Sequence, residues 1–238
     1  MQLGRKGVFW FTDTLDRAQL IELVERCEQL GYSALWYPEA LRYESFSLGS
    51  FLLAHSKNLI IASGIANIYA RDPAATKQGQ HTLSTLSGGR FLLGLGVSHS
   101  PLVEDMRGHQ YRRPLATMRS YLDGMEQAAT KFPALGEPWP TVLAALGPQM
   151  TALGGERTSG VHPYNVTPEH TGLTRASSDP RNGFALSKRC SWSLKLRRRG
   201  KLPGKPWRST YRYRITGITG SAWALPIKIW KTAGAISF

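Results

Sequence analysis

Cysteine is scarce in this 238-residue chain, which has only Cys27 and Cys190. Neither belongs to a CxxC motif or a Cys/His cluster, so a disulfide scaffold is excluded and a zinc module is not expected. Long hydrophobic runs are also missing, because the best one, Leu59–Ala66, is interrupted by Ser63 and Gly64 and is too short to span a bilayer. The apolar part of residues 1–11 is too brief for a signal peptide. These absences predict a soluble, cytoplasmic protein.

Acidic residues are almost absent from the last part of the chain. Residues 1–171 contain 15 Lys and Arg and 15 Asp and Glu, whereas residues 172–238 contain 15 Lys and Arg and a single acid, Asp179. The second region therefore carries 15 − 1 = +14, which is the whole net charge of the chain. Two compositions are joined in one chain, and we interpret the two regions separately.

Residues 1–171 alternate between short apolar runs and segments in which apolar residues recur at helical spacing. The apolar runs are continuous, which is typical of parallel strands covered by helices. No GxGxxG loop follows the first strand, so six strands by residue 163 favour an incomplete TIM (β/α)8-type barrel, an α/β fold, over a dinucleotide-binding sheet. The expected strands are 6–11, 34–37, 59–65, 90–96, 141–146 and 160–163, and the expected helices begin near Asp16, Pro73, Pro114 and Pro148.

In such a barrel, the chemistry belongs to residues just after the carboxyl ends of the strands. A glycine inside the third strand, Gly64, indicates a bulge or a close backbone approach, which serves either a flat ligand or simple packing. His99 follows the fourth strand and can donate a proton near neutral pH, although a surface histidine without a role is the alternative.

The fifth and sixth expected strands also end in candidate residues. Gly147-Pro148 begins a helix whose free N–H groups can hold a phosphate, although the same pair suits any helix start. His162 places a second histidine on this face. No nucleophile–base pair, metal cluster or paired carboxylate emerges, so the face is expected to hold a cofactor that supplies the reactivity.

Three segments carry a family resemblance: residues 63–73 (SGIANIYARDP), 88–99 (GGRFLLGLGVSH) and 143–148 (LAALGP). Together they resemble the luciferase-like monooxygenase superfamily, and most closely its branch that uses the deazaflavin coenzyme F-420. The resemblance covers residues 6–171. It implies a TIM barrel that binds F-420 at its carboxyl mouth and transfers hydride to or from a small organic substrate. An FMN-dependent monooxygenase on the same fold is the alternative.

The resemblance also implies roles for single residues. The bulge at Gly64-Ile65 backs the ring of the cofactor, often through a non-proline cis peptide, and the loop around Gly147 lies near the cofactor phosphate. His99, the expected catalytic proton donor, falls where some relatives carry a carboxylate, and Glu39 falls where some carry a histidine. The expected cofactor-binding residues are Ser63, Gly64, Ile65, Asn67, Gly96, Ser98, Gly147 and His162, and no metal is expected.

The basic tail, residues 172–238, admits four interpretations. It is a nucleic-acid or polyanion-binding arm acting through residues 188–214, a membrane-surface segment, a disordered extension, or the product of a reading-frame shift. No amphipathic period supports the membrane interpretation. The genetic code tests the last interpretation. A codon read one frame over combines the degenerate third base of one codon with the first two bases of the next, which the amino acid mostly fixes.

The offset reading of the tail restores a family-like sequence. Residues 215–220 (ITGITG) can be completed one frame over as NYRNNW, and residues 206–230 as LALHLSLPNYRNNWLRLGFTDQDLE. Acidic residues return in this reading, which removes the charge anomaly. We therefore prefer a frameshift near Thr171-Gly172 and expect a poorly ordered tail.

A barrel without its last two strands has open strand edges and an incomplete site. We expect weak or absent activity in this chain and a tendency to aggregate or self-associate. The expected partner is a small-molecule substrate, with no specific nucleic acid and no membrane.

Overall fold

The computed structural model describes residues 1–176 except 2, 5, 132–137 and 165. The strands in this part are β1 (Gly7–Phe9), β2 (Ala34–Tyr37), β3 (Ile60–Ser63), β4 (Ala66–Asn67), β5 (Phe91–Gly96), β6 (Thr141–Ala144) and β7 (Val161–His162). The helices are α1 (Arg17–Gln29), α2 (Ser45–Ala54), α3 (Pro73–Leu86), α4 (Ser100–Glu104), α5 (Pro114–Ala129), α6 (Pro148–Arg157) and α7 (Pro168–Ala176).

Local sequence signals explain where the best-defined helices begin and end. Asp16 caps α1 in a capping box, in which its carboxylate accepts from the Gln19 N–H at 2.9 Å and the Gln19 side chain accepts from the Asp16 N–H. Gly31 follows the helix with a φ of +67°, a left-handed conformation that favours glycine. Asp72 likewise caps α3, which begins at Pro73.

The strands form one parallel sheet in the order β1-β2-β3-β5-β6-β7, with β4 also paired to β5. Consecutive strands are neighbours, and helices or loops connect their ends over the same face, which is the construction of a barrel wall. The predicted α/β fold is confirmed, and residues 1–176, as far as they are described, form part of a TIM-type barrel with six staves (barrel strands) when β3 and β4 count as one.

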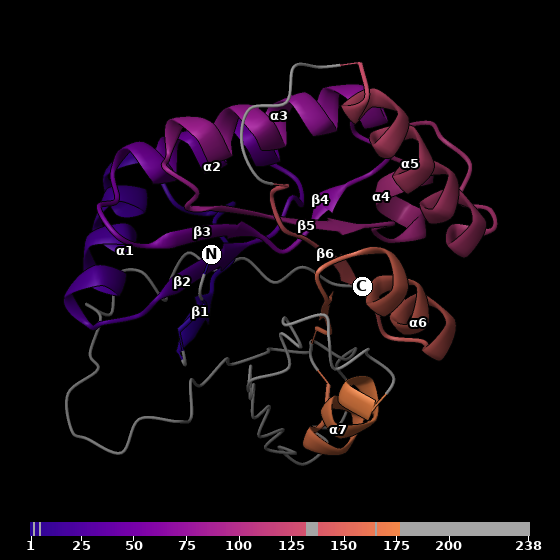
Figure 1. Cartoon of the computed structure of the whole chain (residues 1–238). Helices are drawn as coiled ribbons and strands as arrows, with labels where there is room; N and C mark the ends of the chain where they lie inside the picture. The colour runs from indigo at the N-terminus through magenta and orange to yellow at the C-terminus, as the bar shows by residue number, and fades with distance from the viewer. Residues whose placement is uncertain (2, 5, 132–137, 165, 177–238) are drawn as a thin grey trace, which may run out of the picture.

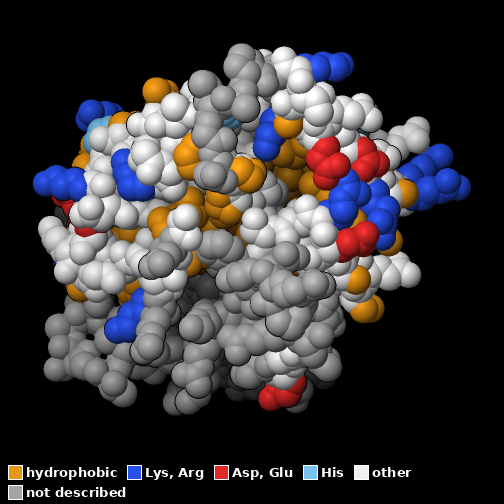
Figure 2. All heavy atoms as spheres, in the orientation of Figure 1, with side chains coloured by type: hydrophobic (Ala, Val, Ile, Leu, Met, Phe, Trp, Pro, Cys, Tyr) orange, Lys and Arg blue, Asp and Glu red, His pale blue; other side chains and the backbone are white. Residues whose placement is uncertain are grey.

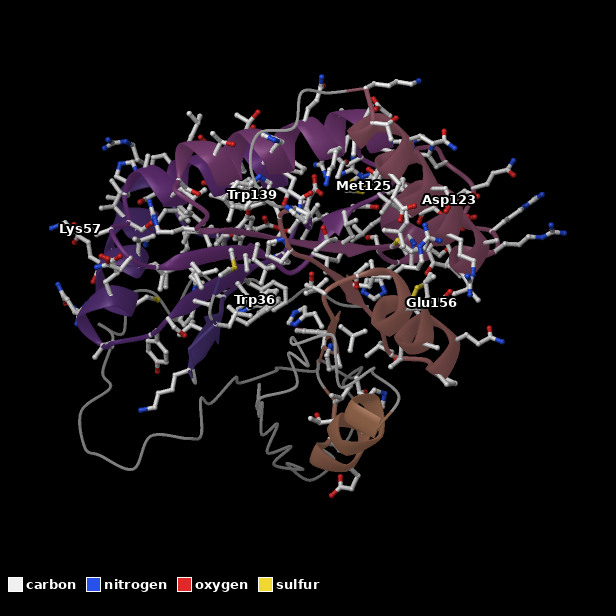
Figure 3. The ribbon with its side chains drawn as sticks, in the orientation of Figure 1. Trp36, Lys57, Asp123, Met125, Trp139 and Glu156 are labelled. Carbon is white, nitrogen blue, oxygen red and sulfur yellow. The ribbon has the colours of Figure 1, made fainter. Side chains whose placement is uncertain are left out.

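The sheet has a helix-covered face and a concave face. Helices α1, α2, α3 and α5 lie along one side of the strands, and α7 lies apart from them at the bottom of the view (Figure 1). Leu35, Ile61 and Leu93 belong to a core cluster that joins the strands to the helices. Trp36 extends from β2 to the opposite side of the sheet (Figure 3). The concave face is a separate cluster built from strand residues: Phe9, Ala34, Trp36, Ile60, Ala62, Leu92 and Val142.

Side chains from distant strands meet across the concave face. The His162 ring on β7 stacks on the Trp36 ring on β2, with centroids 4.5 Å apart and planes 13° from parallel. Phe9 on β1 also stacks with His162 at 6.1 Å. Because these strands stand at opposite ends of the sheet, the sheet must curl strongly, as a barrel wall does.

Ion pairs tie the last helices of the wall together. The guanidinium of Arg157 on α6 contacts carboxylates of Asp123 and Glu126 on α5, at 2.8 and 2.9 Å. Acidic and basic side chains accordingly gather over α5 and α6 (Figure 2). Both carboxylates are largely exposed, so the pairs are worth little individually and serve mainly to orient the helices.

Three helices were not expected from the sequence: α2, α4 and α7. Helix α7 runs across Thr171-Gly172, where the frame junction is predicted, and ends at Ala176. The expectations for the tail, including the poorly ordered region 172–238 and the polyanion-binding segment 188–214, fall almost wholly outside the described residues and stay predictions.

Candidate functional site

The third stave of the barrel wall consists of β3 and β4, and a bulge separates these two strands. Ala62 pairs with Leu92 and Ala66 pairs with Leu95, so four residue steps on one strand (66 − 62) match three on its partner (95 − 92). Side chains an even number of residues apart share a face in a regular strand. Here Ala62 lies in the concave cluster and Ala66 in the helix-side cluster, so one extra residue has inverted the strand.

The extra residue lies at Gly64-Ile65, where the peptide bond is cis, as the resemblance implies. The predicted bulge is confirmed. Ser63 joins it to β5, because its hydroxyl donates to the Gly94 carbonyl and accepts from the Gly94 N–H, both at 2.9 Å.

Two glycines of β5 allow the bulge to lie close to its neighbour. A Cβ on Gly94 would stand 2.1 Å from the Ser63 carbonyl oxygen, and a Cβ on Gly96 would stand 2.5 Å from Cγ1 of Ile65. Both distances are far below van der Waals contact, so glycine is required at each position. Gly96, which is predicted to bind the cofactor, thus has a structural role: it leaves room for the Ile65 side chain of the bulge.

His162 lies next to the bulge on the concave side. Its Nε2 atom is 3.2 Å from the position of a Gly64 Cβ, is buried, and has no hydrogen-bond partner. Burial lowers the pKa of His162 to about 4, which keeps the imidazole neutral at physiological pH. The structure therefore brings together five of the predicted cofactor-binding residues: Ser63, Gly64, Ile65, Gly96 and His162.

Asn67 completes this group from the strand side. It pairs with Gly96, and its side-chain oxygen accepts from the Tyr69 N–H at 3.0 Å, which turns the chain toward α3. Its own N–H donates to the Glu39 carboxylate at 2.7 Å. The Asn67 side-chain oxygen is thus used within its own turn.

Ser98, His99 and Gly147 lie at the ends of neighbouring strands and form a looser group. Ser98 has a φ of +59°, and its carbonyl accepts from the Tyr111 hydroxyl at 3.3 Å, so the loop after β5 folds back on itself. His99 is the exposed N-cap of α4, and its side chain makes no capping hydrogen bond. Gly147 is the exposed N-cap of α6, with open space where a Cβ would stand.

Glu39, reached by the loop after β2, is the centre of a charged network that sequence reasoning missed. Its carboxylate meets the guanidinium of Arg71 at 2.5 Å and that of Arg107 at 3.9 Å. Arg71 also pairs with Glu44 at 2.6 Å. No motif links Glu39 to Arg71 and Arg107, which lie far from it in the chain and meet it only in the folded structure.

Buried polar atoms without partners gather at this end of the sheet. The described part of the chain has eight buried side-chain atoms that lack a hydrogen-bond partner, and five of them belong to Thr12, Asp13, Tyr69, Arg107 and His162. Four of these residues lie at or just past the carboxyl ends of β1, β4 and β7, and Arg107 joins them through Glu39. An unpaired buried polar atom costs about 1–3 kcal/mol. Each of these atoms can therefore form a hydrogen bond with water or with a polar ligand at this end of the sheet.

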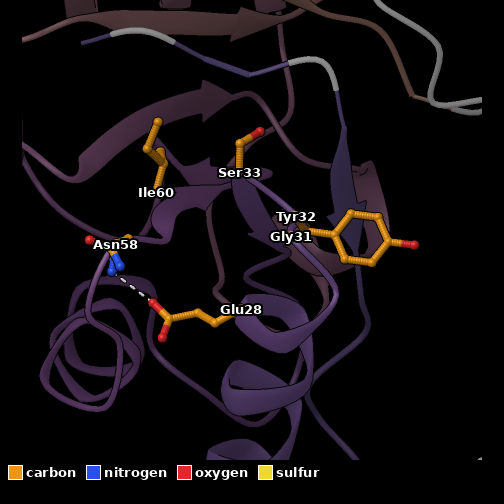
Figure 4. A pocket seen from close by; sticks show the side chains of 6 residues that line it. All are labelled: Glu28, Gly31, Tyr32, Ser33, Asn58 and Ile60. Carbon is orange, nitrogen blue, oxygen red and sulfur yellow. Dashed lines mark hydrogen bonds between the residues drawn. The ribbon is translucent and has the colours of Figure 1, made fainter.

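A cavity of about 370 Å³ lies at the other, amino-terminal end of the strands (Figure 4). Its one acidic side chain, Glu28, accepts from the N–H groups of Lys57, Asn58 and Leu59 at 2.7–3.1 Å, and these bonds lower its pKa even though desolvation opposes them. This carboxylate fixes the loop before β3. Glu28 lies at the end of the sheet opposite the candidate site and is not one of its residues.

The described residues contain no group of three His, Cys, Asp or Glu side chains placed to hold a metal ion. Within the same residues, no helix is both long and apolar enough to cross a membrane.

The family model for the luciferase-like monooxygenases matches residues 6–179, and the chain belongs to that family. Its members and neighbours include F-420-dependent and FMN-dependent oxidoreductases. A Mycobacterium tuberculosis protein named as a coenzyme F-420-dependent oxidoreductase is 27% identical over 215 residues, which cover 78% of this chain and 61% of that protein. The 5,10-methylenetetrahydromethanopterin reductase of Methanolobus tindarius is 27% identical over 180 residues, which cover 65% of this chain and 55% of that enzyme.

Solved structures show the same fold at lower identity. The coenzyme F-420-dependent tetrahydromethanopterin reductase from Methanopyrus kandleri has a TM-score of 0.63 at 19% identity, covering 77% of this chain and 63% of that one. A type II Baeyer–Villiger monooxygenase component from Pseudomonas putida, in complex with FMN, has a TM-score of 0.54 at 16% identity, covering 64% and 54%. The chain spans about three fifths of the length of the curated relatives it matches.

Proposed function

We propose that the carboxyl mouth of this half-barrel binds the deazaflavin coenzyme F-420, and that the protein transfers a hydride between this cofactor and a small organic substrate, with an activity that the aberrant C-terminal tail impairs. The observation that carries the proposal is the inverted bulge at Gly64-Ile65, together with the buried polar atoms without partners at this end of the sheet, of which His162 Nε2 lies beside Gly64. A bulge at a strand end re-aims the backbone toward a ligand, and the unpaired atoms fit a polar, ring-bearing group.

Several of the predicted residues receive a role in this proposal. The bulge and Gly96 would support the ring of the cofactor, with the neutral His162 imidazole beneath Gly64 on the concave side. The free N–H groups at the start of α6, next to Gly147, would hold its phosphate. When bound, the cofactor supplies the hydride donor or acceptor. The exposed imidazole of His99 is the group that we assign to proton transfer with the substrate.

FMN on the same site is the second candidate, favoured by the structural likeness to an FMN-bound monooxygenase component. Both cofactors carry a flat tricyclic ring system and a phosphate, so the residues above fit either one. Relatives named for F-420 favour the deazaflavin. The substrate in both cases is a small molecule, and the proposal includes no nucleic acid and no membrane.

Titration of the purified full-length chain with F-420 and, separately, with FMN tests the proposal. Quenching of cofactor fluorescence should give saturable binding, tighter for F-420, and a hydride donor such as a secondary alcohol should bleach the deazaflavin absorbance. Binding of FMN alone, with oxygen consumption on reduction, would replace the first candidate with the second. Binding of neither cofactor, by a chain whose circular dichroism shows a folded α/β protein, would overturn the proposal.

A further inference from the structure

The loop after β2 delivers one buried acidic side chain, Glu39, to the bulge. Its side chain is 2% exposed, which is rare for a carboxylate and requires charge compensation. Arg71 and Arg107 provide that compensation from two other segments of the chain.

Glu39 holds the bulge at two points. Its backbone N–H donates to the Ile65 carbonyl at 3.2 Å, and its Oε2 accepts from the Asn67 N–H at 2.7 Å. The preceding strand adds a third point, because the Tyr37 carbonyl accepts from the Gly64 N–H at 2.7 Å. Gly64, Ile65 and Asn67 of the bulge are therefore tied to Tyr37 at the end of β2 and to Glu39, two residues further along the chain.

The two carboxylate oxygens have separate tasks. Oε2 takes the Asn67 N–H, and Oε1 takes the Arg71 guanidinium. Arg71 is itself held by the Phe46 ring, 4.9 Å from its guanidinium carbon, and by the Glu44 carboxylate. The Glu39 side chain is thus fixed from both sides, which suits it to hold a backbone in place and not to exchange a proton with a substrate.

We infer that Glu39 is a positioning residue, which fixes the Gly64–Asn67 bulge as a rigid support for the cofactor ring. The cofactor part of this inference rests on the proposed function. The clamp itself is a property of the protein without ligand, so it can be tested independently.

The matched variants are Glu39→Ala, Glu39→Gln and Glu44→Gln. Glu39 and Glu44 both pair with the same Arg71 nitrogen, but Glu44 is half-exposed and caps α2 instead of contacting the bulge. In Glu39→Gln the side-chain oxygen can still accept from the Asn67 N–H, so this variant should rescue part of the loss and should fold if Glu39→Ala does not.

Amide hydrogen exchange of the full-length, ligand-free chain tests the clamp. Exchange at Asn67 should rise about tenfold or more in Glu39→Ala, the size expected for losing a charge-assisted hydrogen bond, and less in Glu39→Gln. Glu44→Gln should leave it within about twofold, because solvent-exposed pairs contribute little. Unchanged exchange at residues 64–67 in both Glu39 variants would overturn the inference, whether or not the protein binds F-420.

Cofactor titration tests the second half. The Kd for F-420 should rise about tenfold in Glu39→Ala and less in Glu39→Gln, while kcat at saturating cofactor stays near the wild-type value. A collapse of kcat in both variants at unchanged Kd would instead make Glu39 a catalytic acid or base and overturn the positioning role. Failure of the wild-type chain to bind F-420 would overturn the proposed function alone, since the exchange experiment still decides the clamp.

Discussion

The imidazole of His162 is sandwiched against the indole of Trp36 and lies directly beneath Gly64. This contact links the last described stave of the wall to the second, and it places a titratable group where water does not reach. Protonation of its unpartnered Nε2 atom would therefore create a buried charge without compensation.

Protonation of His162 should destabilise the fold in acid. Its folded-state pKa, about 4, is below the unfolded value of 6.5, so the unfolded chain binds the proton first as the pH falls. Above pH 6.5 both states are neutral and the residue has no effect. Between pH 6.5 and 4 it should remove about 3 kcal/mol from the free energy of unfolding.

Urea unfolding of the wild type and of His162→Phe at pH 7 and pH 4.5 measures this effect. The variant keeps an aromatic ring on Trp36 but cannot titrate, so its loss of stability on acidification should be smaller. Equal losses in the two proteins would show that His162 is not the titrating group.

Substitution of Gly94 should disrupt the support of the bulge. A Cβ there would stand 2.1 Å from the Ser63 carbonyl oxygen, which belongs to backbone and cannot rotate away. Gly94→Ala should therefore lower the free energy of unfolding by about 3 kcal/mol, measured as a shift in the denaturation midpoint. Gly147→Ala is the matched control, because nothing lies within 4 Å of that Cβ position, and it should stay within about 0.5 kcal/mol of wild type. Similar midpoints for both variants would contradict the close approach.

An acidic residue at position 147 should weaken cofactor binding without lowering the stability of the fold. The backbone there is extended, with a φ of −91°, so any side chain fits, and an aspartate would cap α6. The same negative charge should repel a phosphate at the helix start. Gly147→Asp should raise the Kd for F-420 about tenfold without lowering the denaturation midpoint. An unchanged Kd would place the cofactor phosphate elsewhere.

The frameshift hypothesis predicts a specific nucleotide arrangement around codons 165–180. Adding or removing one base there should open a frame that encodes the acidic, family-like sequence read from residues 206–230. The restored protein should bind F-420 more tightly than this chain and remain soluble at higher concentration, as size-exclusion chromatography would report. A gene sequence in which neither offset frame stays open would refute the hypothesis.

Local signals in the sequence predicted some elements residue by residue. Helices α3 and α6 begin at Pro73 and Pro148 as expected. Proline suits the first helical position because its φ is already helical and its missing N–H is not needed there. Gly64 in an apolar run correctly indicated the bulge. Helix α2 was missed because its residues (SFSLGSFLLA) include no charged side chain and only serine as a polar one, so the contrast between its buried and exposed faces is weak.

Contacts between distant residues explain what the sequence did not reveal about the site. Glu39 and Arg71 are 32 positions apart, and only the parallel arrangement of β2 and β4 brings them together. From the sequence, Glu39 stands out only where some relatives carry a histidine, and Arg71 only as part of the segment 63–73. The unpaired atoms of Thr12 and Asp13 have no signature in the chain, because a missing partner is a property of the folded surroundings.

The pairing of β3 and β4 with β5 constrains the number of residues between Ala62 and Ala66 more than it constrains their identity. Removing one residue between Ala62 and Ala66 would restore regular alternation and send Asn67 to the opposite face of the wall, away from the carboxylate that receives its N–H. Point substitutions at Ile65 leave that count intact. Over evolutionary time, this stretch should therefore accumulate exchanges of amino acids while excluding single-residue insertions and deletions.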